Sequence, residues 1–366
     1  MATDQTAWQP DWAVPPGEIL ADALVDRGMT QSELARRMDR PVKTINEIVN
    51  AKAAITPDTA IQLERALGIS ARLWNGMETQ YREHLAQQRA DAELEAAGDW
   101  AKDFPVRDLV RHGVIPDCRT RSRKVAALLS FFRVSSPTAW ERQWLSPAAS
   151  FRASPTFLSS PKAVAAWLRW GEIEAASAET APFDAAKFRD AVREARNLTR
   201  REPFVQIVER VKELFAAAGV VLVLTRELRG THLSGAARWL GPDRALIQLS
   251  LRHKTEDQFW FTLLHEAHHI LDAKRRDYLD AADSDDDKDE AEAYADRFAR
   301  DTLVPPAAWA AFVAAGDVSE SAVRAFAKTQ DIAAGIVVAR LHHEDLLDRS
   351  HLVPLRRQIS WPAVLP

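Results

Sequence analysis

Apolar residues in the first hundred positions recur every three or four residues, which is the spacing of one helix face. The pattern predicts helices over 18–27, 31–38, 42–50, 57–67 and 70–97. Gly28 and Gly68 follow two of these segments, where a helix-ending residue is expected. The segment Thr30-Gln-Ser-Glu33 is a capping box, which begins the second helix. The sequence therefore predicts a five-helix unit at the N-terminus.

Two of these helices are joined by the three-residue turn Asp39-Arg40-Pro41. A short helix, a tight turn and a second short helix form the helix-turn-helix plan, in which the second helix enters the DNA major groove. The exposed face of the 42–50 helix offers Val42, Lys43, Asn46 and Glu47 to base edges. Gln31, Arg40, Thr44 and Lys52 are placed to reach phosphates.

The charge of this region is balanced. Residues 17–52 contain six basic and six acidic side chains, but residues 36–52 contain five basic and two acidic ones. The local excess suits a DNA-facing patch of modest affinity. The alternative is that the unit serves only in dimerisation or protein binding.

A different pattern follows in the second half of the chain. Short apolar runs at 219–224, 233–239 and 245–250 predict three strands. The next run, Phe259–Ile270, has no Gly or Pro and predicts a helix. Residues 98–204, which lie between the helix-turn-helix region and these strands, again show helical spacing and reveal no function.

The predicted helix at 259–270 contains His265-Glu266-Ala267-His268-His269, which reads His-Glu-x-x-His. Residues four apart share a helix face, so the imidazoles of His265 and His269 can bind one Zn²⁺. Glu266 can accept a proton from the attacking water, as in zinc peptidases. By itself the five-residue motif also occurs by chance; the buried helical context favours a metal site.

A catalytic zinc needs a third protein ligand. On a predicted helix over 289–303, Glu292 shares the apolar face, whereas Glu290 shares the polar one. An inward-facing carboxylate requires a cation or a hydrogen-bond network. We therefore predict Glu292 as the ligand, with Asp296 and Asp272 as alternatives.

The segment Glu292-Ala-Tyr-Ala-Asp-Arg-Phe-Ala-Arg-Asp-Thr-Leu-Val-Pro305 resembles the signature of the ImmA/IrrE metallopeptidases. The resemblance covers roughly residues 205–345 and implies a zincin-like α+β fold in which Glu292 is the third zinc ligand. It also implies cleavage of a repressor protein, and in zincins the substrate pairs as an added strand, here near 245–250. His268 departs from the family, which usually has Gly at that position. A bulkier residue there is expected to alter the site or supply another ligand.

The N-terminal region resembles the lambda-repressor-like (XRE) helix-turn-helix family, and its HigA antitoxin branch in particular. The resemblance rests on Gly28-Met-Thr-Gln-Ser-Glu-Leu-Ala35, Lys43-Thr-Ile-Asn-Glu-Ile48 and Ala60-Ile-Gln-Leu-Glu-Arg-Ala-Leu-Gly68. It implies recognition of a double-stranded operator by a homodimer and, in that branch, a cognate toxin as partner.

Composition limits the remaining possibilities. The 366 residues carry a net charge of −4, which argues against a general nucleic-acid coat. The single cysteine, Cys118, suits a reducing cytoplasm. A signal peptide and an apolar stretch of membrane-spanning length are not expected, so we predict a cytoplasmic protein without a membrane partner.

These observations predict a mainly α protein with a small α+β domain. The expected divisions are 14–97 for DNA binding, 98–204 for a helical middle segment, 205–345 for a zinc peptidase and 346–366 for a tail. The expected function is a DNA-binding regulator whose zinc endopeptidase cuts a repressor of a stress, phage or toxin–antitoxin operon. The alternative is an antitoxin-like autorepressor whose zincin fold binds a toxin or ligand without proteolysis.

Overall fold

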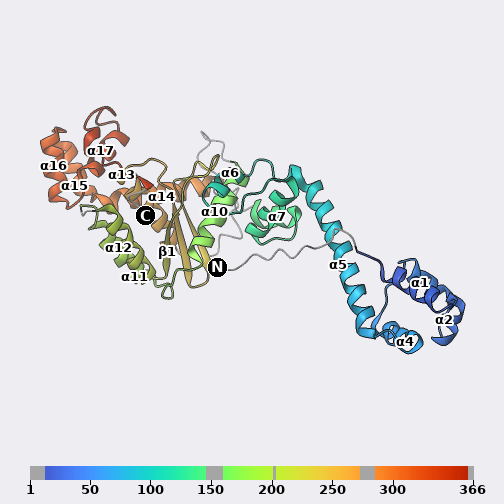
Figure 1. Cartoon of the computed structure of the whole chain (residues 1–366). Coiled ribbons are helices and arrows are strands. Elements are labelled where there is room, and N and C mark those ends of the chain that lie inside the picture. The colour runs from blue at the N-terminus through green and yellow to red at the C-terminus, as the bar shows by residue number, and fades with distance from the viewer. Residues whose placement is uncertain (1–12, 146–159, 201–202, 273–284, 362–366) are drawn as a thin grey trace. The chain divides into compact units, whose positions relative to one another are not determined.

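The structure, a computed structural model, describes residues 13–145, 160–200, 203–272 and 285–361 (Figure 1). Contacts between residues divide the chain into two compact units. The first unit comprises residues 1–99 and 120–125, and the second comprises residues 100–119 and 126–366. Each unit contains its own cluster of buried apolar side chains and is described by itself.

Residues 13–99 of the first unit form five α-helices and a short 3₁₀ turn. Its elements are α1 (Pro16–Asp26), α2 (Gln31–Arg37), α3 (Val42–Val49), α4 (Pro57–Leu67), α5 (Ala71–Ala96) and η1 (Ala97–Asp99). Each α-helix contributes a fully buried side chain to one core: Leu20, Leu34, Ile45, Leu63 and Trp74. The five predicted helices are confirmed, with bounds that differ by at most two residues.

Local signals explain where these helices begin and end. The Thr30 hydroxyl accepts a hydrogen bond from the Glu33 amide at 3.1 Å, which satisfies a free N–H at the start of α2. Gly28 and Gly68 adopt positive φ angles of 60° and 72°, a conformation that glycine tolerates best. Both glycines therefore end their helices as the sequence predicted.

The second unit is built on a three-stranded sheet. Its strands are β1 (Val220–Leu224), β2 (Gly235–Gly241) and β3 (Arg244–Leu249), in the order β1-β3-β2. β3 is central, since it pairs parallel with β1 and antiparallel with β2. The expectation that a substrate strand would pair near 245–250 is therefore wrong, because both edges of β3 are already hydrogen-bonded. Among the described residues, β2 pairs with β3 alone. It is the edge strand beside the zinc-motif helix, which is the helix that contains His265 and His269.

Helices cover both faces of this sheet: α10 (Pro161–Ala175) covers one face, and α11 (Ala185–Arg196), α12 (Phe204–Ala216) and α13 (Glu256–Leu271) cover the other. The other described helices that follow the first unit in sequence are α6 (Val106–Arg111), α7 (Arg121–Phe132), α8 (Pro137–Trp140), α14 (Asp285–Leu303), α15 (Pro306–Ala314), α16 (Glu320–Thr329) and α17 (Ala334–His343). Val220, Leu222 and Leu224 of β1 face a core shared with α11, α12 and α13. Val221 and Val223 face Ala175 of α10 on the other side. The strand thus alternates between two covered faces.

The helical middle of the chain is joined to the sheet by α10. The side-chain amide of Gln248, in the central strand, donates to the Trp167 carbonyl at 2.7 Å and to the Thr225 hydroxyl at 2.8 Å. Gly171 leaves room for this amide, because a Cβ at that position would lie 2.0 Å from Gln248 Oε1. Most of the segment predicted as a middle domain, residues 100–119 and 126–204, therefore shares one unit with the region that contains His265 and His269.

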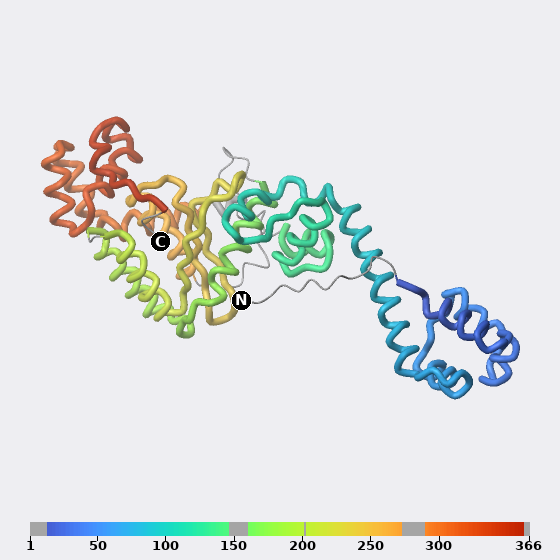
Figure 2. Tube along the Cα trace, in the orientation of Figure 1, coloured from blue at the N-terminus to red at the C-terminus, as the bar shows by residue number. Residues whose placement is uncertain are grey.

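The last three helices continue the core beyond α14 (Figure 2). Phe312 of α15 stacks on Phe326 of α16 with ring centroids 4.4 Å apart. Most side chains of α17 are buried, including Ile336, Val338 and Leu341. Within the described ranges, no helix is both long and apolar enough to cross a membrane.

Candidate functional site

The zinc-motif helix α13 is held at its first turn by the C-terminal segment. Glu256 and Asp257 are almost fully buried there. Arg356 donates two hydrogen bonds to the Asp257 carboxylate, at 2.7 and 3.2 Å, and Arg357 lies 3.0 Å from Glu256. Carboxylates at a helix N-terminus are stabilised by its dipole, and the arginines compensate their burial. This clamp fixes the direction of the helix that carries His265 and His269.

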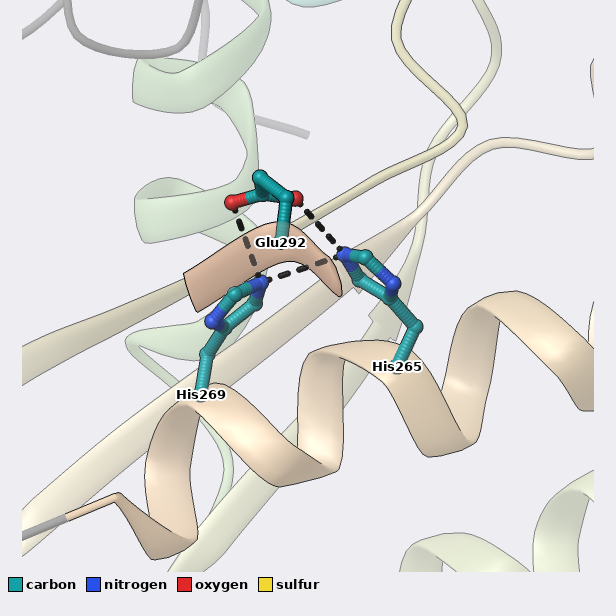
Figure 3. A group of neighbouring side chains, drawn as sticks. All are labelled: His265, His269 and Glu292. Carbon is teal, nitrogen blue, oxygen red and sulfur yellow. Dashed lines mark hydrogen bonds and ion pairs between the residues drawn. The ribbon is translucent and has the colours of Figure 1, made fainter. Parts of the chain in front are cut away.

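Three side chains converge at the last two turns of α13 (Figure 3). His265 Nε2 lies 3.0 Å from Glu292 Oε2 and 3.1 Å from His269 Nε2. His269 Nε2 lies 3.5 Å from Glu292 Oε1. The two histidines come from successive turns of α13, and Glu292 reaches them from α14. The structure thus brings together the three residues that the sequence predicted as metal ligands.

The spacing of these donor atoms suits a tetrahedral zinc. Three ligands at about 2.0–2.1 Å from one zinc ion lie about 3.3 Å from each other. The two imidazole nitrogens lie 3.1 Å apart, and each lies 3.0–3.5 Å from a different oxygen of Glu292. One donor atom from each of the three residues lies within 4.8 Å of the others, so a small shift of the side chains would bring them to that spacing. Two imidazoles and one carboxylate are also the donor set of many catalytic zinc sites, which keep a further position open. The residues therefore fit the metal that the motif implies.

Asp296 lies on the same helix as Glu292, one turn later, and holds the other nitrogen of His265. The Nδ1–H of His265 donates to Asp296 Oδ1 at 2.9 Å. A carboxylate in this position fixes the ring orientation and leaves Nε2 for a metal. Of the two alternative ligands, Asp296 has this supporting place, and Asp272 is not in the donor group of the described residues.

The charges of the site are strongly coupled. Burial lowers the pKa of His265, but hydrogen bonds to Asp296 and Glu292 outweigh it and raise that pKa to about 10. Partial desolvation opposes ionisation of Glu292, yet hydrogen bonds from His265 and His269 hold its pKa well below the usual range. The metal-free site therefore contains an imidazolium beside a carboxylate at neutral pH. A metal would have to displace that proton.

The helix of Glu292 is anchored at its opposite end. The Arg196 guanidinium, from α11, donates to the carbonyls of Thr302 and Leu303 at 3.1 Å each. Arg340, from α17, donates to the Val304 carbonyl at 3.3 Å. Cations at the last carbonyls of a helix satisfy free acceptors and complement its dipole. These contacts hold α14 while its earlier residues face α13.

The side chain of Glu266 is buried where α13 packs against the edge strand β2. An added Cβ on Gly235 would lie 2.7 Å from Glu266 Oε1, which places this carboxylate directly against the strand backbone. The negative charge of Glu266 also helps to raise the pKa of His265. Glu266 therefore lies close to the metal ligands without belonging to the donor group of the described residues.

His268 packs toward α14. Its ring lies 5.1 Å from that of Phe298, with the planes tilted by 34°. His268 is outside the donor group formed by the described residues. Its role here is contact between the two helices that carry the ligands.

The predicted DNA-contacting residues lie on and around α3 in the first unit. Val42, Lys43 and Asn46 are exposed on that helix. The Asn46 amide donates to Gln31 Oε1 of α2 at 3.3 Å, so these two amides form one polar pair. Lys43 lies 3.7 Å from Glu47, one turn later. The first turns of α2 and α3 therefore present amide groups and a flexible cation together.

The remaining predicted contacts lie around this pair. Arg40, in the turn, donates from Nε to Gln62 of α4 at 2.9 Å, which anchors the turn to the core helices. Thr44 is half-buried, and Lys52 is exposed beyond the end of α3. Lys52 is the only one of the predicted DNA-contacting residues that follows α3 in sequence, and its exposed side chain is available for a phosphate.

Comparisons with known proteins concern the N-terminal region. A family model described as helix-turn-helix matches residues 20–74. Virulence-associated protein I of Dichelobacter nodosus is 39% identical over 77 residues, which span 21% of this chain and 71% of that protein. The HTH-type transcriptional regulator YddM of Escherichia coli is 29% identical over 76 residues, covering 21% of this chain and 81% of the relative.

A solved structure shows the same local similarity. The Pseudomonas aeruginosa antitoxin HigA, in a structure with the higBA promoter, is 32% identical to the matching part of this chain. The match covers 25% of this chain and 92% of that one, with a TM-score of 0.20.

Proposed function

The chain belongs to the helix-turn-helix family of DNA-binding transcriptional regulators, and from this premise we propose a regulator with two activities. Its first unit binds an operator in double-stranded DNA as a homodimer. Its second unit is a zinc endopeptidase that cuts a repressor protein. The spacing of His265, His269 and Glu292 is the observation that carries the second activity.

The operator proposal rests on α3 as the recognition helix. Asn46 suits adenine, whose N6 and N7 atoms an amide can contact together, and the neighbouring Gln31 holds that amide from α2. Exposed Lys43 adds a cation at the same face. A dimer of such units would read two half-sites about one helical turn apart.

The peptidase proposal assigns one task to each residue of the site. A zinc ion held by His265, His269 and Glu292 would supply Lewis acidity. Glu266 is the general base: it takes the proton of the attacking water and passes it to the leaving amine. Asp296 keeps the His265 ring oriented through Nδ1.

The substrate is an extended polypeptide segment paired with the outer edge of β2. Extended peptides often bind by adding a strand to an open sheet edge. β2 is such an edge, and its first residue, Gly235, abuts Glu266. A peptide bond docked beside Gly235 would therefore lie next to the general base. In the resembling peptidase family the substrate is a repressor, which we adopt for this protein.

Glu266→Gln tests the peptidase. The substitution removes the base but leaves His265, His269 and Glu292 intact, so zinc content and operator binding should persist. Loss of a general base typically costs about 10²–10⁴ in rate. Cells carrying the variant should repress the regulated operon normally and fail to release it under inducing stress, with the target repressor uncut.

The same strain separates this proposal from its alternative. If the Glu266→Gln strain induces like the wild type, proteolysis is not the output, and the antitoxin or ligand-binding function replaces it. If the variant loses zinc or its operator footprint, Glu266 has a structural task and the assigned role is wrong. Glu290→Gln is the matched control, because it removes an exposed carboxylate of α14 outside the donor group.

A further inference from the structure

Gly235, the first residue of the edge strand β2, lies directly against α13, the helix that contains His265 and His269. Its position leaves no space for a side chain. An added Cβ would lie 2.7 Å from Glu266 Oε1, 2.8 Å from Glu266 Cγ and 2.8 Å from the Thr262 methyl carbon. The three atoms belong to two residues of α13, Glu266 and Thr262, which are one turn apart, so a methyl group could not be accommodated by the motion of one flexible atom.

The contact involves the carboxylate itself. Glu266 is 7% exposed, and its Oε1 is the atom nearest to the position of the added Cβ. The strand backbone thus forms one wall of the space in which this carboxylate lies. Glu266 directly follows His265 in α13, so the carboxylate that meets the edge strand belongs to the residue next to a predicted metal ligand.

We infer that Gly235 is a positioning residue for Glu266: its bare backbone fixes the carboxylate beside His265 and beside the edge where a polypeptide would pair. The inference rests on the proposed peptidase function. Gly235 touches neither the donor atoms nor the bond to be cut. It acts through Glu266, because a side chain at this position would push the base out of the place where it meets water.

The test is Gly235→Ala, with Gly241→Ala as a matched control. Both glycines belong to β2, but a Cβ on Gly241 would meet no atom within 4 Å. Gly241→Ala should therefore behave like the wild type. Gly235→Ala should retain one zinc per chain and normal operator binding. Its kcat on a fluorogenic library of extended peptides should fall about 10²-fold or more, as for loss of a general base.

A double-mutant cycle shows whether the effect passes through Glu266. In the Glu266→Ala background, Gly235→Ala should cause no further loss of activity. It should also lower the melting temperature less than in the wild-type background, because the truncated side chain no longer meets the methyl group. The melting temperatures can be measured on zinc-loaded protein without any substrate.

Each outcome decides the proposal. Equal behaviour of Gly235→Ala and Gly241→Ala in an active enzyme would overturn it. So would a melting-temperature loss from Gly235→Ala that is as large without the Glu266 side chain as with it. If Gly235→Ala fails to fold alone but folds with Glu266→Ala, the contact is supported; failure in both backgrounds assigns the crowding to other atoms and overturns it. A wild-type protein that cuts nothing would instead contradict the peptidase function, while the melting cycle still tests the contact.

Discussion

The Nδ1–H of His265 donates a hydrogen bond to Asp296 at 2.9 Å, and this bond leaves Nε2 of the same ring facing Glu292 and His269. Glu292 and Asp296 are one turn apart on α14, so a single helix face supplies both a metal ligand and the acceptor that orients another ligand. An imidazole held in this way binds metal through a defined nitrogen and with greater basicity.

Asp296→Asn should weaken zinc binding without removing it. The amide is the same size as the carboxylate but lacks its charge, and loss of such a supporting group typically costs about 10–100-fold in metal affinity. Competition with a chromophoric chelator measures the affinity. Unchanged affinity in Asp296→Asn would show that the His265–Asp296 hydrogen bond has no part in metal binding.

Glu292 and Glu290 provide a direct comparison of two carboxylates on one helix. Both side chains are exposed, but Glu292 lies 3.0 Å from His265, whereas Glu290 is outside the donor group of the described residues. Glu292→Ala should abolish stoichiometric zinc, because a three-ligand site loses one ligand. Glu290→Ala should retain about one zinc per chain by elemental analysis. Equal losses in the two variants would contradict the ligand assignment.

Zinc binding should release a proton and strengthen as pH rises. Although burial opposes it, hydrogen bonds to Asp296 and Glu292 raise the pKa of metal-free His265 to about 10. His265 is thus protonated at pH 7, and a metal can bind only after displacing that proton. The apparent affinity from this group should rise about tenfold per pH unit between pH 7 and pH 9. Glu292, whose pKa is held low, is already ionised in this range.

Calorimetry in buffers of different ionisation enthalpy counts the released protons. Asp296→Asn should release fewer protons near pH 8, because one of the two hydrogen bonds that raise the His265 pKa loses its charge. The metal-free protein has the opposite pH dependence. The His265 contribution to its stability is complete below pH 6.5, the usual pKa of this group, and is lost as pH rises toward 10. A zinc affinity that does not depend on pH over this range would contradict the coupled site.

Several parts of this molecule followed from local sequence. Thr30 and Gly28 specify a helix start and a helix end through contacts within a few residues. The convergence of His265 and His269 follows from helical geometry alone. Glu292 was predicted from its place on the apolar face of a later helix, because an inward-facing carboxylate needs a partner there. The structure confirms the partners but not the burial, since the side chain of Glu292 is 52% exposed.

Other parts depend on how distant segments meet. β3 lies in the centre of the sheet and β2 at its edge. The periodicity of three short apolar runs cannot predict which strand is central and which lies at an edge. Gly235 and Glu266 are 31 positions apart in the sequence, so their contact could not be predicted from the presence of a glycine in a strand. Asp296 was considered as a ligand, but only the placement of α14 determines which nitrogen of His265 it meets.

The last prediction concerns the recognition helix. The full-length protein should bind an inverted repeat upstream of its own operon, with half-sites about one helical turn apart. Asn46 is exposed on α3 and paired with Gln31, so Asn46→Ala removes a group suited to adenine. The variant should lose about 5-fold to 150-fold of its preference for the operator over altered sequences, which corresponds to 1–3 kcal/mol for one bidentate contact. Lys43→Ala should relax specificity in the same direction.

Lys52, exposed beyond the helix, is assigned to a phosphate contact. Lys52→Ala should therefore weaken binding to all sequences alike and reduce the salt dependence of binding by about one ion. Footprinting and titrations at several salt concentrations distinguish the two classes. If all three variants bind every sequence as the wild type does, α3 does not read the operator.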